Sequence, residues 1–139
     1  MKKGKKLLII AVVILAIASA ILGWLLYSSR PLETISVNEI EEIKVYAIPP
    51  DEEVILSGVE IDRVVPLLQN MKISKPGYKV FALGGQTVRI TVQKTDGSII
   101  EISNVGNVQI IIDGRSYRAD YESAEAINNF VNKVLETGF

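Results

Sequence analysis

The sequence predicts an N-terminal transmembrane helix followed by a small α+β domain with the element order ββ-α-ββββ-α. Three observations lead to this fold class: an uncharged apolar stretch near the N-terminus, apolar residues that alternate with a period of two between turn signals, and two later segments with helical apolar spacing. Because the links between the last four predicted strands are too short for crossovers, we expect an antiparallel sheet. Both helices of the domain are expected on its one apolar face.

The apolar stretch runs from Leu7 to Tyr27 without a charge and follows a basic tail, residues 1–6, that contains four lysines. As a helix these residues span roughly 31 Å, which matches the hydrocarbon thickness of a bilayer. Trp24 and Tyr27 lie near the far end, where aromatic side chains prefer the membrane interface. The lysines predict a cytoplasmic N-terminus, so we expect a single-pass protein of the cell membrane whose residues 39–139 form an extracytoplasmic domain.

A cleaved signal peptide is the alternative interpretation of the same segment. Residues 16–18 and 18–20 both have the small-x-small form of a cleavage site. Apolar residues continue beyond either position, whereas a signal peptidase usually cuts just after the apolar region. The sequence therefore favours an uncleaved signal anchor over residues 7–27. Residues 28–38, with a proline and small polar residues but no sustained period, are expected to form a stalk.

The first half of the predicted domain is a hairpin followed by a helix. Ile43, Val45 and Ala47 alternate with polar neighbours, and residues 49–51, Pro-Pro-Asp, separate this strand from a second short one. Residues 57–60, Ser-Gly-Val-Glu, have the form of a capping box. The helical apolar face that follows consists of Ile61, Val64, Val65 and Leu68. Pro66 is expected to kink or tighten this helix, because its nitrogen carries no hydrogen to donate.

The second half predicts a meander of four strands and a final helix. Pro76-Gly77 and Gly84-Gly85 mark turns before it, and Asp96-Gly97 and Asp113-Gly114 predict two-residue hairpin turns within it. The apolar positions of successive strands are Val88, Ile90, Val92, Ile100, Ile102, Val108, Ile110 and Ile112. Ser123 is expected to cap the final helix and Gly138 to end it. The apolar face of that helix consists of Ile127, Phe130, Val131, Val134 and Leu135.

Composition excludes several chemistries. The chain contains no cysteine and no histidine, so the common zinc ligands, the thiol nucleophile, disulfides and the usual neutral-pH base are missing. We expect no metal and no cofactor. Neither S-x-x-K in the outer domain nor G-x-S-x-G occurs, and no phosphate-binding glycine motif is present. The protein is therefore expected not to be an enzyme, with a Ser-Lys hydrolase whose pair forms only on folding as the alternative.

Charge excludes one class of partner. Residues 28–139 contain eleven Lys and Arg against sixteen Asp and Glu, a net charge of −5. Nucleic acid requires a basic face, so nucleic-acid binding is not expected. The same net charge argues against close electrostatic docking on an anionic bilayer, and solubility is its simplest explanation.

Candidate binding residues follow the last Asp-Gly turn. Arg115, Arg118 and Tyr121 lie at the predicted junction between the last strand and the last helix. Arg and Tyr are enriched in binding hot spots, but they are also common at strand ends. The two interpretations are a small exposed binding patch and ordinary surface positions.

A resemblance to known proteins is carried by the basic tail, the single span and the segments DGSIIEIS and IIIDGRSYRADYESAEAINNFVNKVLE. In these features the chain resembles small membrane-anchored outer proteins of Gram-positive bacteria with domains of unknown function. The positions that match the strand pattern I-x-I-D-G-x-x-Y are Ile110, Ile112, Asp113, Gly114 and Tyr117. This resemblance covers about the last fifty residues and the anchor. It implies a bacterial cell-envelope setting and carries no catalytic residues.

The expected function is non-catalytic binding of a protein, peptide or envelope component outside the membrane, with the lipid bilayer contacted through Leu7–Tyr27. Two alternatives come from other classes. One is an immunity or resistance protein that intercepts a toxin or antibiotic peptide. The other is an assembly or regulatory subunit that acts through its transmembrane helix.

Overall fold

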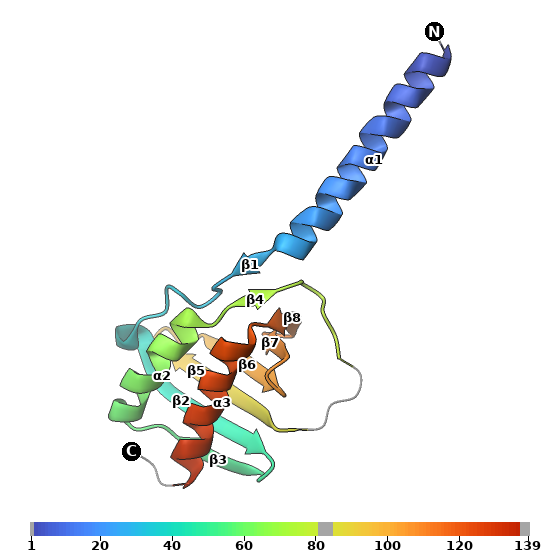
Figure 1. The fold of residues 1–139 in the computed structure, drawn as a ribbon. Coiled ribbons are helices and arrows are strands. Elements are labelled where there is room, and N and C mark those ends of the chain that lie inside the picture. Colours follow the sequence, from blue (N-terminus) through green and yellow to red (C-terminus); the bar gives the residue numbers. More distant parts are fainter. Residues whose placement is uncertain (1, 81–84, 137–139) are drawn as a thin grey trace.

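The structure is a computed structural model that describes residues 2–80 and 85–136 (Figure 1). It consists of a protruding helix, α1 (Lys2–Leu26), and a domain in which one antiparallel sheet is covered on one face by α2 (Gly58–Asn70) and α3 (Tyr121–Glu136). The predicted α+β fold class with an N-terminal apolar helix is confirmed. Gly84 and Gly138, which were expected at a turn and at a helix end, lie outside the described residues.

Helix α1 extends the predicted apolar segment at its N-terminal end, because Lys2 to Lys6 are helical as well. None of its residues is buried, and it is long and apolar enough to cross a membrane, a property that it shares with signal sequences. One hydrogen bond joins its end to the domain: the indole Nε1 of Trp24 donates to the carbonyl of Pro76 at 2.9 Å. The helix therefore meets the domain at a defined position.

The sheet has eight strands in the order β1-β4-β8-β7-β6-β5-β2-β3, all antiparallel to their neighbours. The strands are β1 (Ser28–Ser29), β2 (Ile40–Ile48), β3 (Glu52–Ile55), β4 (Ile73–Ser74), β5 (Thr87–Lys94), β6 (Ile99–Val105), β7 (Gln109–Ile112) and β8 (Arg115–Ala119). A short 3₁₀ helix, η1 (Val37–Glu39), precedes β2. Six of these strands match the predicted order, and the two-residue strands β1 and β4 are additional.

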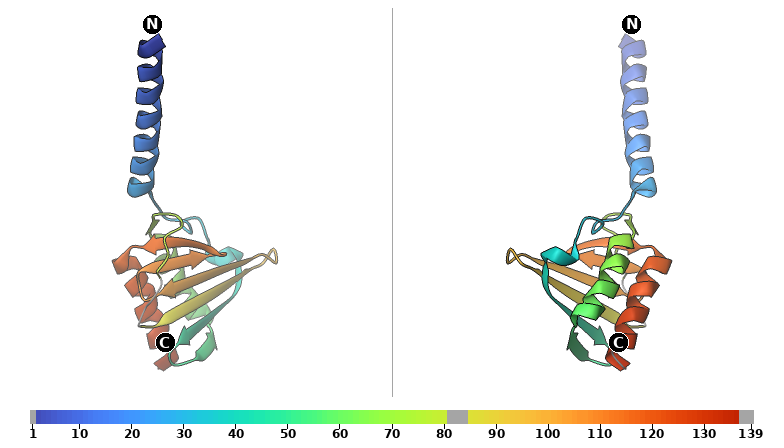
Figure 2. Two further views of the ribbon diagram at one scale, coloured as in Figure 1. Left: turned by 90° about the vertical axis from the view of Figure 1, so that its right-hand side faces the viewer. Right: turned by 90° about the vertical axis from the view of Figure 1, so that its left-hand side faces the viewer.

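The core lies between the sheet and the two helices, which share one face of the sheet (Figure 2). The register places apolar residues of neighbouring strands opposite each other, as with Ile43 and Val92 or Val45 and Ile90. The predicted helix faces point into the same core, where Leu68 of α2 is fully buried. Because burial follows the period of two in the strands and 3.6 in the helices, the apolar pattern alone specifies which face is covered.

Residues 28–38 differ from the expected stalk. Ser28 and Ser29 pair with Ser74 and Ile73, and the side chains of Leu32 and Ile35 are both only 5 % exposed in the core. The side-chain Nε2 of Gln69 donates to the carbonyl of Ile35 at 2.7 Å, which ties the segment to α2. The folded domain thus begins directly after α1. Three apolar residues in eleven, one of them the exposed Val37, are too few to establish a period, which is why the sequence pattern did not indicate the burial of Leu32 and Ile35.

The two Asp-Gly turns have different geometries. Asp113 and Gly114 both have positive φ, 48° and 85°, and Ile112 pairs with Arg115, so the predicted two-residue turn is confirmed there. The same prediction for Asp96-Gly97 is wrong. The amide of Lys94 donates to the carbonyl of Ser98 across a three-residue loop in which only Gly97 has positive φ. The Asp96 carboxylate accepts from the Ser98 hydroxyl and amide, which lowers the pKa of Asp96.

The start of α2 and the position of Pro66 agree with the sequence prediction. The Ser57 hydroxyl accepts from the Glu60 amide at 3.3 Å, and the Glu60 carboxylate accepts from the Ser57 amide at 2.9 Å, so the capping box is confirmed. Pro66 lies inside α2, which stays helical from Gly58 to Asn70. Since Pro66 is on the exposed face, the carbonyl it leaves without an intrahelical donor can be reached by water.

The N-cap of α3 is Asp120, and the prediction of Ser123 is wrong. The helix begins at Tyr121, the Asp120 carboxylate accepts from the Ser123 amide at 3.2 Å, and the Asp120 carbonyl accepts from the Ala124 amide at 3.0 Å. Ser123 occupies the third helical position instead, where its hydroxyl donates to the Asp120 carbonyl. An Asp three residues before a Ser gives two equally good cap candidates, and the strand β8 ends early enough for the first one to be used.

Replacing Leu32 with alanine should destabilise the domain by about 2–4 kcal/mol, because it removes a buried side chain from the core. Pulse proteolysis in urea, applied to the full chain in detergent micelles, measures this loss. Val37→Ala is the matched control, since Val37 is 40 % exposed and should change stability little. Equal urea midpoints for Leu32→Ala and the native chain would mean that residues 28–38 are a stalk after all.

Replacing Asp120 with alanine should cost about 1 kcal/mol, the usual loss for removing an N-cap carboxylate. Asp120→Asn should retain most of the stability, because an asparagine side chain accepts the same hydrogen bond from the Ser123 amide. The same urea midpoints test both variants. A pair of variants with identical stability would contradict the assignment of Asp120 as the cap.

Candidate functional site

A groove of about 430 Å³ lies at the end of the domain from which α1 protrudes. Strand β4, the end of β8 and the first residue of α3 meet there (Figure 1). Its polar walls are Ser28, Lys72, Ser74, Tyr78, Asn107, Arg118, Asp120 and Tyr121. Its apolar floor includes Ile73, Val108 and Ala119. The groove therefore combines an apolar base with two cationic and two phenolic side chains.

Strand alternation explains why Arg118 faces the groove. In β8, Tyr117 packs against the core and Ala119 is buried, so Arg118 between them points to the opposite face of the sheet. Arg118 is opposite Gln109 of β7 on one side and Ser74 of β4 on the other. Arg118 therefore has a strand neighbour on each side, but no helix lies over its side chain, which is exposed.

The segment after β4 forms one side of the groove. The backbone amide of Gly77 donates to the carbonyl of Ser116 at 2.8 Å, and the side-chain Nε2 of Gln109 donates to the carbonyl of Tyr78 at 3.4 Å. These bonds place the ring of Tyr78 beside Arg118, whose guanidinium carbon lies 6.0 Å from the ring centroid. A cation at this distance from an aromatic face is held by the ring quadrupole, so Tyr78 limits the directions in which Arg118 can turn.

The backbone of Lys72 is held by hydrogen bonds, whereas its ammonium group forms no ion pair with the described residues. Its amide donates to the Ser123 hydroxyl at 3.2 Å, and its carbonyl accepts from the Asp120 amide at 3.1 Å. In the part of the chain that the structure describes, neither Lys72 nor Arg118 forms an ion pair. Asp120 also lines the groove, but its carboxylate already accepts the Ser123 amide as the helix cap. The groove thus offers two cations to an incoming anion.

The structure brings together two of the three predicted site residues. Arg118 and Tyr121 line the same groove, and the Tyr121 side chain is 56 % exposed. Arg115 lies apart from them, beside Pro76 and Gly77, where it lines a shallower depression of about 290 Å³. It is displaced because Arg115 directly follows the turn, at the opposite end of β8 from Tyr121.

Sequence reasoning missed two groove residues, Lys72 and Tyr78. Both lie more than thirty residues before the predicted patch, and only the pairing of β4 with β8 brings them to it. One local signal was present, because Lys72, Lys75 and Lys79 form the densest run of basic residues in the outer domain. A basic run beside a short strand at the sheet edge indicates a cationic surface, although it does not name the strand that it will join.

The arrangement lacks the contacts of a hydrolytic site. Ser28 and Ser74 share the groove with Lys72, but no hydrogen bond joins the Lys72 ammonium group to either hydroxyl, and Lys72 is exposed rather than desolvated. Within residues 2–80 and 85–136 no group of three or more carboxylates could hold a metal ion. What two unpaired cations between phenol rings can do is bind a phosphate or carboxylate through charge-assisted hydrogen bonds.

A second polar surface lies over β2, β3 and β5, on the sheet face that no helix covers and toward the sheet edge remote from β1 (Figure 2). Here the charges satisfy one another: Lys44 pairs with Glu53 at 3.8 Å, and the Arg89 guanidinium lies 5.9 Å from the Tyr46 ring centroid. The Tyr46 hydroxyl donates to the Asp51 carboxylate, a hydrogen bond that raises the pKa of Tyr46. Because Lys44 already has a carboxylate partner and Glu53 and Asp51 add negative charge, this face is a weaker candidate for anion binding than the groove.

In comparisons with known proteins, no family model, no curated protein and no solved structure matches this chain. The resemblance to membrane-anchored outer proteins of Gram-positive bacteria therefore stays a prediction, and the assignment of function depends on the groove and on α1.

Proposed function

We propose that this protein is a single-pass membrane protein whose outer domain binds, without catalysis, an anionic group of a peptide, protein or envelope component in the groove. The N-terminus lies in the cytoplasm, and residues 28–139 lie outside it. The observation that carries the proposal is the pair Lys72 and Arg118, two cations in one concave surface that have no anionic partner among the described residues.

The geometry of the groove supports binding rather than turnover. Its volume of about 430 Å³ accommodates a small anionic headgroup or a few residues of a peptide. Arg118 is oriented by Tyr78, Tyr121 offers a large exposed ring, and both lie beside an apolar floor. Arginine and tyrosine in this arrangement are typical of binding hot spots. A nucleophile with an adjacent base, which catalysis would need, has no counterpart in these contacts.

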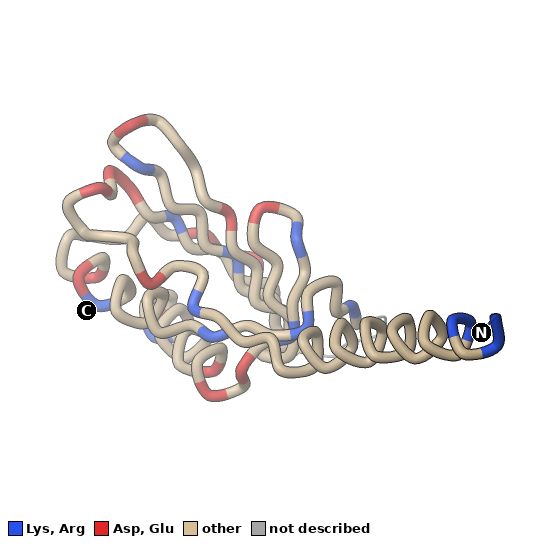
Figure 3. The backbone as a smooth tube through the Cα atoms, turned by 90° about the horizontal axis from the view of Figure 1, so that it is seen from above, with Lys and Arg blue, Asp and Glu red and all other residues tan. Residues whose placement is uncertain are grey.

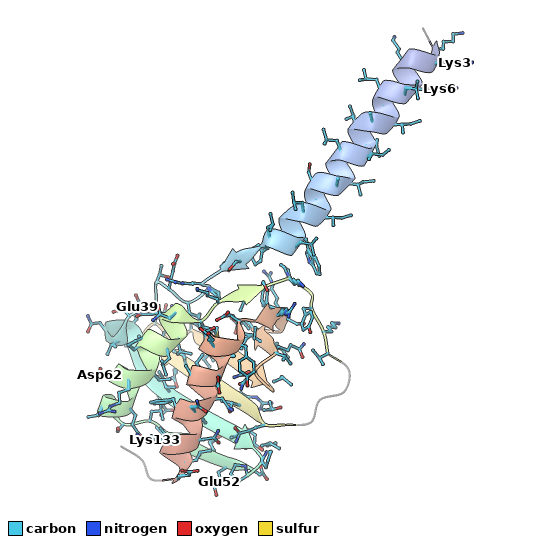
Figure 4. The ribbon with its side chains drawn as sticks, in the orientation of Figure 1. Lys3, Lys6, Glu39, Glu52, Asp62 and Lys133 are labelled. Carbon is cyan, nitrogen blue, oxygen red and sulfur yellow. The ribbon has the colours of Figure 1, made fainter. Side chains whose placement is uncertain are left out.

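The charges at the two ends of α1 support the proposed topology. Lys3 and Lys6 lie at the end of α1 remote from the domain (Figure 4), with two further lysines in the same tail. Trp24 and Tyr27 lie at the other end, next to the domain. The lysines favour retention of their end in the cytoplasm, and the aromatic residues fit the membrane interface at the other end.

The absence of cysteine makes this topology directly testable. In intact cells, a membrane-impermeant maleimide should label a Thr95→Cys variant, because Thr95 is exposed in the β5–β6 loop of the outer domain. A Lys3→Cys variant should be labelled only after the cells are permeabilised. The native chain is the blank. Labelling of Lys3→Cys in intact cells, with protection of Thr95→Cys, would reverse the proposed orientation.

Anion binding is tested by NMR titration of the full chain in neutral detergent with inorganic phosphate and with a short acidic peptide. Amide signals of residues 72–78 and 118–121 should shift, and Lys72→Ala with Arg118→Ala should weaken binding by about ten-fold or more, since each charged hydrogen bond contributes roughly 1.5–3 kcal/mol.

The matched control removes two cations elsewhere: Lys44→Ala with Arg89→Ala should leave the titration unchanged. A further variant, Arg118→Ala with Tyr121→Ala, should keep its urea midpoint, because both side chains are exposed. Binding that neither groove variant weakens, or that the control weakens equally, would refute the groove as the site.

A further inference from the structure

The charge of the outer domain is divided between two ends. We define the membrane-proximal end as residues 28–33, 72–79 and 115–121, which contain six Lys and Arg against two acidic residues, a net charge of +4. The remaining residues of the outer domain contain five Lys and Arg against fourteen acidic residues, a net charge of −9. Seen from above, some of the basic segments of the domain lie close to the base of α1, and the others are spread among acidic segments along the domain (Figure 3).

Contacts to α1 and between these segments hold the membrane-proximal end together. Ser28 pairs with Ser74, and Ser74 pairs in turn with Arg118. The Trp24 indole donates to the carbonyl of Pro76, the residue after Lys75. The acidic residues Glu52 and Asp62 lie on the side and far end of the domain, away from α1 (Figure 4). The cations therefore lie on the side from which the span leaves, and most acidic residues lie away from it.

The position of the groove relative to the bilayer follows from the number of residues between α1 and the residues that line the groove. Ser28, which lines the groove, is the second residue after the end of α1 at Leu26. At roughly 3.3 Å per extended residue, two residues reach about 7 Å beyond the helix. The headgroup layer on each side of a bilayer is about 5–7 Å thick. The mouth of the groove thus lies at the depth of the phospholipid headgroups whenever α1 crosses the membrane.

We propose that anionic phospholipid headgroups of the bilayer that holds α1 occupy the groove, with Lys72 and Arg118 bound to the lipid phosphate. This inference rests on the proposed function, because it names the ligand of the same groove. Lys75, Lys79, Arg30 and Arg115 add attraction to neighbouring headgroups, since charges within about 8 Å of an anionic surface act at physiological ionic strength. The acidic remainder of the domain is repelled by the same surface, which favours a single orientation.

Composition alone led to the opposite expectation. The net charge of −5 argued against docking on an anionic bilayer, but that number averages two ends of opposite sign. Because electrostatic attraction falls off within a Debye length, only the charges that face the bilayer contribute to docking. An acidic peptide would match the same two cations, but the span delivers the groove to lipid headgroups permanently and at high local concentration.

The test uses the full chain in lipid nanodiscs, one set of phosphatidylcholine alone and one of phosphatidylcholine mixed with phosphatidylglycerol. Hydrogen exchange of the amides of residues 72–79 and 115–121 is measured in both. We expect exchange about ten-fold slower in the phosphatidylglycerol discs, and we expect high salt to remove the difference. Amides of β5 and β6, which lie in the middle of the sheet, should exchange equally in both and report an intact fold.

Matched triple variants assign the effect to the groove. Lys72→Gln, Lys75→Gln and Arg118→Gln together should abolish the difference between the two lipids. Lys44→Gln, Arg89→Gln and Lys94→Gln, which remove the same charge from the uncovered face and its hairpin, should preserve it. Equal protection in both lipids, or protection that survives the first triple variant, would overturn the proposal.

A third arm separates lipid from free anion. Inorganic phosphate, or a short acidic peptide, is added to the phosphatidylcholine discs. We expect neither to reproduce the protection. If either does so while phosphatidylglycerol does not, lipid is not the ligand and this inference fails, but the proposed anion-binding function stands. If no anion slows hydrogen exchange in the groove and the groove variants change nothing, both the lipid inference and the proposed anion-binding function fail.

Discussion

The pairing of β4 with both β1 and β8 is the constraint on which the rest of this arrangement depends. Two residues, Ile73 and Ser74, connect the segment that leaves α1 to the last strand before α3. Without this short strand, Lys72 and Arg118 would belong to unrelated parts of the surface. The pairing is completed by the Lys72 backbone, which bonds to Asp120 and Ser123 at the start of α3. Three segments that are far apart in the chain, residues 28–29, 72–74 and 118–123, thus meet through a few hydrogen bonds.

The core and the groove follow different physical rules. In the core, Ile43, Ile90 and Leu68 are buried because apolar area leaves water wherever the periodic faces meet. In the groove, charged groups remain in water and gain little from one another. Its character comes from what is lacking: on the uncovered face Lys44 has Glu53 as a partner, whereas no ion pair forms at Lys72 or Arg118 in the described part of the chain. Cations without an ion-pair partner contribute to binding only where an anionic ligand is close to them.

Most of the fold could be predicted from the sequence, and the exceptions share a cause. Long periodic segments such as Thr87–Lys94 and Tyr121–Glu136 carry enough repeats for the apolar face to be recognised. Strands β1 and β4 have two residues each and hence no period. Leu32 and Ile35 are isolated apolar residues for the same reason. The error at Ser123 arose because Asp120, three positions earlier, could take the same capping role, and the error at Asp96 arose because the hairpin loop has three residues rather than two.

The site could be predicted in part. Arg118 and Tyr121 were recognisable because an outward strand position and a helix start lie three residues apart. Lys72 and Tyr78 were not recognisable as site residues, because the pairing of β4 with β8 that brings them to the groove cannot be read from a single sequence.

The hydrogen bond from Trp24 to Pro76 has a mechanical consequence. Because the donor belongs to α1 and the acceptor to the domain, the bond fixes the rotation of the helix about its own axis. Each residue of an α-helix turns it by about 100°, so one residue inserted directly before Trp24 would rotate every preceding side chain of α1 by that angle relative to the domain. The contact with the domain therefore determines which stripe of α1 faces a given direction relative to the sheet.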